Sequence, residues 1–318
     1  VMTDGEGDSR RVCGVIFATQ RGLCAVSARV VIDCTGDGCA AAAAGCSFDI
    51  GREGDGRLQP MTLEFLLGGV SPDAISVWGG TDPVRIPAGE FAGMEFRELC
   101  KQKNREGELP ENVTIVRLHH TLRADERVVN ATQKNGADPL DPASVAEAEL
   151  ELRKQIDACA AFLRKYIPGY ENCRVIDSAD TLGVRESRRI RGLDSVCDGD
   201  VETGRMRDDA VVHKAWFLID IHNPAGGGQA EGHSHPALPY DIPYGALIPQ
   251  DVRGILVAGR CISGTHRAHA SYRVMSICMA MGEAAGVAAA IAAERNADPR
   301  DIPAADVRAE LASRGVEL

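Results

Sequence analysis

The stretch GILVAGRCISGTHRAHASYRVMSICMAMGEAAGVAAAIAA, residues 254–293, decides the fold of this chain. Its apolar run 255–258 is short enough to be a buried parallel strand. The run ends at Gly259 and Arg260, where the chain must turn. A glycine in such a turn lets the backbone approach a ligand closely. We therefore expect a strand followed by a ligand-binding turn.

A polar loop and a long helix are expected after this turn. Residues 261–273 hold two histidines and two arginines, and residues 274–293 are rich in alanine and glycine, with Glu283 as the one charge. The start of a helix presents unpaired N–H groups and a positive dipole end to anionic or carbonyl oxygens. The second run is long enough to test as a membrane span. Its small residues and Glu283 instead favour a helix buried in the protein.

The pattern of strand, glycine turn and helix occurs again near the N-terminus. The sequence RVVID at 29–33 predicts a strand, TGDG at 35–38 a turn, and the alanine run 40–44 a helix. Residues 12–19 and 23–27 predict a preceding hairpin. A single TGDG turn is weak support for a nucleotide site. Two such units in one chain are typical of a site at the carboxyl edge of a parallel sheet.

The middle of the chain predicts a mixed α+β region. Asp141 and Pro142 begin the clearest helix, over 143–166, because aspartate caps it and proline suits its first turn. Strands are expected over 59–67, 113–118, 121–123 and from residue 174, a shorter helix over 91–103, and a C-terminal helix over 303–313.

Composition excludes several classes of partner. The chain has 318 residues, 44% of them hydrophobic and 4% aromatic, and its net charge is −11. This length suits two domains. The acidic balance, without a basic tract, argues against nucleic acid and against an anionic membrane as partners.

The cysteines indicate a reducing compartment. There are eleven, none in a Cys-x-x-Cys pair, which argues against an iron–sulfur cluster or a zinc ribbon. An odd number in a chain of this length is typical of reduced thiols, so we expect a cytoplasmic protein.

A series of motifs carries a family resemblance. In order they are VVIDCTGDG, GREGDGRLQPMTLEF, LGVRESRRIRG, DIHNP, DIPYGALIP and the block from ILVAGR to the last alanine run. Together they resemble the FAD-dependent oxidoreductases related to fumarate reductase and succinate dehydrogenase flavoproteins, over about residues 12–293. The resemblance implies FAD as cofactor and an α/β fold, a doubly wound FAD-binding domain interrupted by an α+β substrate or capping domain. The expected divisions are 1–58, 59–235 and 236–318, the first and last forming the FAD-binding domain.

One family feature is missing from this sequence. Such flavoproteins begin with a strand and a Gly-x-Gly-x-x-Gly turn that holds the pyrophosphate, and none precedes Val12. We therefore expect the doubly wound domain to be incomplete by at least one βαβ unit. The alternative to an autonomous enzyme is a non-catalytic fragment, or a subunit that completes a flavin site only with a partner.

The resemblance assigns cofactor-binding residues. The first turn would lie along the adenosine side of FAD, and the second near the pyrophosphate and ribityl chain. The start of the last helix would direct N–H groups at the flavin pyrimidine edge. A structural salt bridge is the alternative role for the arginine of the second turn. The candidates are Thr35, Gly36, Asp37, Gly38, Gly259, Arg260, Ser263, Ser271, Arg273 and Val274.

The stretch LGVRESRRI supplies candidate catalytic arginines. Arg185, Arg188 and Arg189 lie within five residues, with Glu186 among them. Guanidinium groups clamp carboxylates with two hydrogen bonds, which suits an anionic substrate. The stretch is similar to a fumarate reductase region in which an arginine donates a proton, which makes Arg185 and Arg188 the candidates. An arginine–glutamate network with a structural role is an equal alternative.

Histidines are the other candidates for proton transfer. His266 and His269 lie in the loop expected beside the flavin, and His222 follows a strand-like run in DIHNP. A solvated loop histidine is the alternative for each. His233 and His235 form a His-x-His pair in a glycine-rich loop, but no third ligand is evident, so we predict a lid and no metal site.

The sequence thus predicts a redox enzyme. A hydride would pass between a C–H bond of a small polar or anionic substrate and the flavin, while an arginine or histidine handles the proton. Homo-oligomers or a partner chain are compatible with this prediction.

Overall fold

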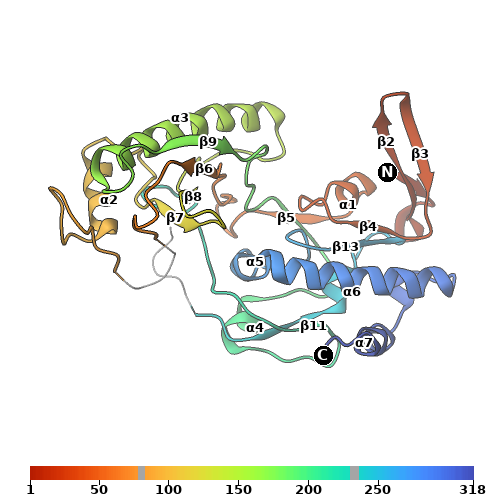
Figure 1. Ribbon diagram of the computed structural model, residues 1–318. Coiled ribbons are helices and arrows are strands. Elements are labelled where there is room, and N and C mark those ends of the chain that lie inside the picture. Colours follow the sequence, from red (N-terminus) through yellow and green to blue (C-terminus); the bar gives the residue numbers. More distant parts are fainter. Residues whose placement is uncertain (78–82, 230–235) are drawn as a thin grey trace. The chain divides into compact units, whose positions relative to one another are not determined.

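The computed structural model describes residues 1–77, 83–229 and 236–318, which form two compact units (Figure 1). Unit 1 comprises Val1–Gly56, Glu186–Ile221 and His233–Leu318, and unit 2 comprises Arg57–Arg185 and His222–Gly232. The sequence predicts residues 186–221 in the middle domain. They group with unit 1 because strands within them pair with strands of that unit.

Unit 1 is built from several small sheets. A three-stranded antiparallel sheet has the order β1-β2-β3, and the other three are two-stranded. The predicted hairpin and the predicted parallel strand are confirmed, since β2 pairs with β3 and β13 pairs in parallel with β4. The strands are β1 Met2–Asp4, β2 Arg11–Thr19, β3 Gly22–Ser27, β4 Val31–Asp33, β5 Phe48–Ile50, β10 Arg188–Ile190, β11 Ala210–Ala215, β12 Tyr240–Pro243 and β13 Ile255–Val257.

Helices of unit 1 cover these sheets. The helices are α1 Cys39–Ala44, α4 Asp198–Thr203, α5 His266–Tyr272, α6 Met275–Glu294 and α7 Ala304–Ser313, with short 3-10 turns η1 Gly7–Ser9, η2 Tyr244–Leu247 and η3 Pro299–Asp301. Figure 1 shows α6, in blue, between the β4–β13 pair and β11, and it contacts all three strands. Its small residues permit this close approach on two sides.

Helix α6 is long and apolar enough to cross a bilayer, a test that core helices also pass. One face, which includes Ile277, Met281, Ala284 and Ala288, is buried in the core of unit 1. The predicted packing of this helix within the protein is confirmed for that face.

The polar loop predicted over 261–273 is wrong, because helix α5 occupies its second half. Thr265 caps this helix, its Oγ1 accepting a hydrogen bond from the Ala268 N–H at 3.2 Å. His266 and His269 are buried in the helix. Polar residue types favoured a loop, but these side chains face the interior of unit 1.

Unit 2 is an α+β unit. Its antiparallel sheet has the order β7-β8-β6-β9. The elements are β6 Phe65–Gly68, β7 Arg117–His120, β8 Glu126–Asn130, β9 Arg174–Ser178, α2 Phe96–Arg105 and α3 Pro142–Tyr166. Helix α3 begins as predicted, since Asp141 accepts a hydrogen bond from the Ala143 N–H at 3.0 Å.

Four predicted boundaries in unit 2 differ from the structure. The strand expected over 113–118 is β7, which begins only at Arg117. The strand expected over 59–67 is confined to β6, and the helix expected over 91–103 starts only at Phe96. Residues 121–123 form a turn before β8, where Thr121 Oγ1 accepts a hydrogen bond from the Arg123 N–H. Side-chain hydrogen bonds of this kind favour turns over strands.

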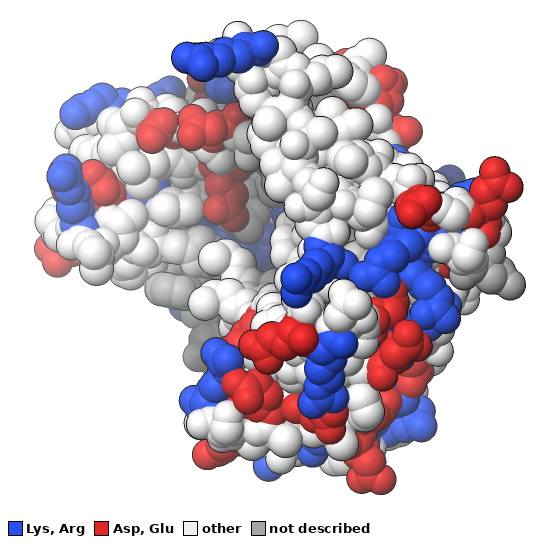
Figure 2. Space-filling model, turned by 90° about the vertical axis from the view of Figure 1, so that its right-hand side faces the viewer, with Lys and Arg blue, Asp and Glu red and all other residues white. Residues whose placement is uncertain are grey.

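Charged groups are mixed on the surface. Figure 2 shows acidic and basic side chains interspersed over the lower part of one face of the protein. Exposed ion pairs are present on the protein, such as Arg314–Glu310, at 2.8 Å at the end of α7. Exposed pairs of this kind add little to stability. The mixture of acidic and basic side chains means that the face in Figure 2 does not carry charge of a single sign.

Two leucines on α3 provide a test of the core of unit 2. Leu152 is fully buried and Leu150 is 66% exposed, in the same helix. Leu152→Ala should lower the free energy of unfolding by about 2–5 kcal/mol, because it leaves a cavity. Leu150→Ala carries the same change in helix propensity and should stay within roughly 0.5 kcal/mol of the parent. Denaturant unfolding of both variants measures this, and equal losses would contradict the packing described.

Candidate functional site

The carboxyl end of β4 is held by one buried carboxylate. Asp33 Oδ1 accepts hydrogen bonds from the N–H and the hydroxyl of Thr35, at 3.0 and 2.7 Å, and Oδ2 accepts one from the Ala41 N–H at 2.9 Å. Thr35 Oγ1 in turn accepts a hydrogen bond from the Cys39 N–H. The aspartate therefore fixes the turn between β4 and α1.

The two predicted glycine turns meet in unit 1. Asp37 Oδ1 accepts a hydrogen bond from Arg260 Nη2 at 2.7 Å, which is the salt bridge considered for this arginine. Gly36 has φ +77°, and a Cβ there would overlap the Arg260 guanidinium. Gly259 has φ +91° and more open surroundings. Glycine is favoured at residue 36 by this conformation, and a side chain there would also displace the Arg260 guanidinium.

Strand β10 brings further groups to Asp37. Ser187 Oγ donates to Asp37 Oδ1 at 2.6 Å, and Arg188 Nη1 donates to the Asp37 carbonyl at 3.2 Å. Arg188 also lies over the ring of Phe48, its guanidinium carbon 5.2 Å from the ring centre. The structure thus joins Arg188 to the TGDG turn. Sequence reasoning missed Ser187, since an isolated serine carries no pattern.

A buried ionic cluster lies in the same unit. Glu186 Oε1 accepts a hydrogen bond from Arg189 Nη1 and lies 2.8 Å from His266 Nδ1. The three side chains are at most 2% exposed. Arg188 and Arg189 point to opposite faces of β10, as neighbouring residues of a strand do.

Arg189 joins this cluster to two loops. Its Nε donates to the Gly264 carbonyl and its Nη2 to the Gly51 carbonyl, both at 2.9 Å. Nη2 also lies 3.4 Å from Glu53 Oε1. Buried arginine is tolerated only when its donors are paired in this way. The structural role considered for the RESRR network is therefore present for Arg189.

His269 is fully buried, and neither ring nitrogen has a hydrogen-bond partner among the described residues. Its ring packs edge-on against Tyr272, with the ring centres 5.4 Å apart. Burial, and then the nearby Arg273, hold the pKa of His269 well below 6.5. This histidine is therefore neutral at neutral pH.

The remaining predicted cofactor residues in unit 1 have protein partners. Ser271 is buried, donates to the Phe217 carbonyl and accepts from the Tyr240 hydroxyl, so the structure places it in the core. Arg273 Nη2 donates to the Asp220 carbonyl at 3.0 Å. Ser263 is buried, and Val274 is the N-cap of α6, the position expected for it.

Two predicted catalytic residues belong to unit 2. Arg185 Nη1 donates to the Pro60 carbonyl at 2.7 Å, and the His222 N–H donates to Gln59 Oε1 at 3.1 Å. His233 and His235 lie outside the described residues. Within the described ranges, no group of three or more histidine, cysteine or acidic side chains could hold a metal ion.

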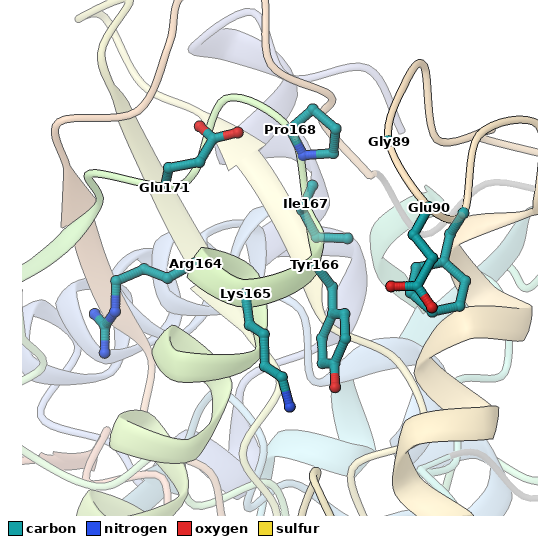
Figure 3. Close-up of a pocket in the computed structure, with 9 residues that line it drawn as sticks. Gly89, Glu90, Arg164, Lys165, Tyr166, Ile167, Pro168 and Glu171 are labelled. Atoms are coloured by element: carbon teal, nitrogen blue, oxygen red, sulfur yellow. The ribbon is translucent and has the colours of Figure 1, made fainter.

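A surface pocket of unit 2 contains none of the predicted site residues (Figure 3). It is lined by residues 89–91, 164–168 and 171. Two of its polar groups have protein partners, since Lys165 Nζ and the Tyr166 hydroxyl both donate to Glu108. This pocket does not resemble the site predicted from the sequence.

Comparison with known proteins identifies the kind of cofactor. A protein family described as FAD dependent oxidoreductase matches residues 1–311. No curated protein and no solved structure matches the chain. The family implies FAD as the cofactor.

Burial of His269 predicts a pH dependence of stability. Because its pKa is lowered on folding, only the unfolded chain takes up this proton below about pH 6.5. The burial of His269 should therefore reduce the free energy of unfolding as pH falls, by at most roughly 1 kcal/mol per pH unit. His269→Gln should show a correspondingly smaller loss between pH 6.5 and 5.

Urea unfolding of both proteins over pH 5–8 measures this difference. Above about pH 7 the two proteins should show the same pH dependence, because His269 is then neutral in both states. Parallel stability curves below pH 6.5 would contradict the assignment.

Proposed function

The chain belongs to the FAD-dependent oxidoreductase family, and on that basis we propose that it transfers a hydride between a small polar or anionic substrate and FAD. The match over nearly the whole chain carries this proposal. It supports a flavin-linked redox enzyme over the alternative of a non-catalytic fragment or an incomplete subunit. Kinship to fumarate reductase and succinate dehydrogenase flavoproteins is part of the proposal.

The residues of unit 1 fit a dinucleotide cofactor. Gly36, Gly38 and Gly259 all have positive φ at the ends of β4 and β13, where a side chain would restrict backbone approach. Arg260 keeps a buried Nε without a partner among the described residues, despite its ion pair with Asp37. The two turns would hold the nucleotide portion, and the N-terminus of α6 would offer N–H groups to the flavin.

Bound FAD supplies a centre that accepts or releases two electrons with a hydride. The chain supplies binding, orientation and proton handling. His266 is the candidate for the proton, because its Nδ1 contacts Glu186 while Nε2 is buried without a partner in the described part of the chain. A positioned histidine of this kind is a typical general acid or base.

Cationic groups favour an anionic or oxygen-rich substrate. Arg188 and Arg260 both lie within hydrogen-bond distance of Asp37, and each has a buried Nε without a partner in the described ranges. Arg260 pairs with the Asp37 carboxylate, whereas Arg188 contacts the neutral Asp37 carbonyl, so two positive charges meet one negative charge there. Guanidinium groups prefer carboxylates and similar oxyanions.

A cytoplasmic location and the absence of nucleic acid and membrane partners complete the proposal. All eleven cysteines are free thiols, and five are buried: Cys46, Cys100, Cys159, Cys173 and Cys261. Burial raises the pKa of the Cys261 thiol to about 12, which leaves it unreactive. Assembly into a homo-oligomer or with a partner chain is compatible with this function.

Flavin binding is testable with two glycine variants. The purified chain, incubated with FAD and desalted, should retain the visible absorption of a flavin. Gly36→Ala should weaken FAD binding roughly tenfold or more, about 1.4 kcal/mol, because φ is +77° and a Cβ meets Arg260.

Gly286→Ala is the matched control. Gly286 lies in α6, and a Cβ there meets nothing within 4 Å. FAD affinity should be unchanged, and stability should rise by roughly 0.5–1 kcal/mol. Protein that stays colourless with added FAD would overturn autonomous flavin binding.

The role of His266 is testable by single-turnover flavin reduction. A panel of small hydroxy acids, keto acids and amino acids would first identify a substrate. His266→Gln should then slow flavin reduction by roughly 10²–10⁴-fold, the usual contribution of general acid–base catalysis. FAD absorption should be retained. A rate within a few-fold of the parent would remove His266 from the chemistry.

A further inference from the structure

The contact between His266 and Glu186 bears on which nitrogen of the histidine ring carries the proton. Its Nδ1 lies 2.8 Å from Glu186 Oε1, and both side chains are at most 1% exposed. The opposite nitrogen, Nε2, is buried and has no hydrogen-bond partner within the described residues. The two faces of this imidazole therefore meet different surroundings.

The charges around Glu186 determine which nitrogen carries the proton. An ionised carboxylate has acceptors only, and Arg189 places a permanent positive charge beside the same oxygen. A neutral imidazole has one N–H, so the bond to Glu186 requires that N–H at Nδ1. Nε2 is then left with its lone pair.

The backbone of His266 is fixed as well as its ring. The residue begins α5 directly after the Thr265 cap, and its N–H donates to Glu53 Oε1 at 3.2 Å. Arg189 contacts both glutamates, at Glu186 and at Glu53. Glu186 thus contacts the ring of His266 and Glu53 its backbone, and both carboxylates contact the guanidinium of Arg189.

We propose that Glu186 is a positioning residue that holds His266 in the Nδ1–H tautomer and presents Nε2 as the proton-accepting atom. This inference rests on the proposed function, in which His266 handles the proton. In the oxidative direction, the O–H or N–H proton of a substrate would pass to Nε2, and its bonding electrons would form the new C=O or C=N bond. The hydride from the adjacent C–H bond would go to the two-electron acceptor that bound FAD supplies. Glu186 itself touches only His266 and other protein groups.

The tautomer can be measured without a substrate. Nitrogen-15 NMR of histidine-labelled protein distinguishes protonated from bare ring nitrogens, and His266→Gln identifies the signal. At pH 8 we expect a proton on Nδ1 and none on Nε2. Free histidine prefers the opposite tautomer, so a proton on Nε2 in the parent protein would overturn the proposal.

Two glutamate variants separate positioning from general stability. Glu186→Gln should shift His266 at least partly toward the Nε2–H form, because the amide can donate as well as accept. Glu53→Gln makes the same chemical change beside the same residue, but it touches only the backbone N–H and Arg189. It should leave the tautomer unchanged. An unchanged tautomer in Glu186→Gln, or equal shifts in both variants, would refute the role of Glu186.

Flavin binding distinguishes failure of this inference from failure of the proposed function. Protein that binds FAD but carries the proton on Nε2 would overturn the role of Glu186 and leave the redox assignment intact. Protein that holds the Nδ1–H form but binds no FAD would leave the role of Glu186 intact and overturn the redox assignment. Should Glu186→Gln fail to fold, the tautomer of the parent protein decides the question alone.

Discussion

The buried guanidinium of Arg189 is the interaction on which the site in unit 1 depends. Transfer of this charge from water is costly, and only well-placed acceptors offset the cost. These acceptors are the carboxylates of Glu186 and Glu53 and the carbonyl groups of Gly51 and Gly264. Because the buried guanidinium has few other hydrogen-bond acceptors, it holds in place the segments that carry these acceptors. The site is therefore organised by electrostatics as much as by apolar packing.

Local patterns in the sequence predicted the framework of this site. The strands at 31–33 and 255–257, the turns that follow them and the long last helix all have strong short-range signals. Their parallel pairing also followed, because both strands end in glycine turns of the same kind. The salt bridge considered for Arg260 has Asp37 as its partner, because the two turns lie at this shared edge. Apolar periodicity and glycine placement are physical properties that a single sequence displays directly.

Other parts of the site could not be predicted from local patterns. Glu186 and His266 are separated by 80 positions, and nothing in either neighbourhood indicates the other. The polarity of residues 261–273 predicted an exposed loop, whereas Ser271 and His269 are buried in a helix. Burial of polar groups is decided by partners that come from elsewhere in the chain. For the same reason, only strand pairing reveals that residues 186–221 group with unit 1.

The pairing of β4 with β13 has a consequence for synthesis of the chain. These strands are separated by more than two hundred residues, and the whole of Arg57–Arg185 lies between them. At ordinary translation rates β4 leaves the ribosome on the order of ten to forty seconds before its partner. Unit 2, whose sheet is closed by much shorter connections, has time to fold during this interval. Closure of unit 1 is therefore a late event, and until then its apolar strand is available to chaperones and to aggregation.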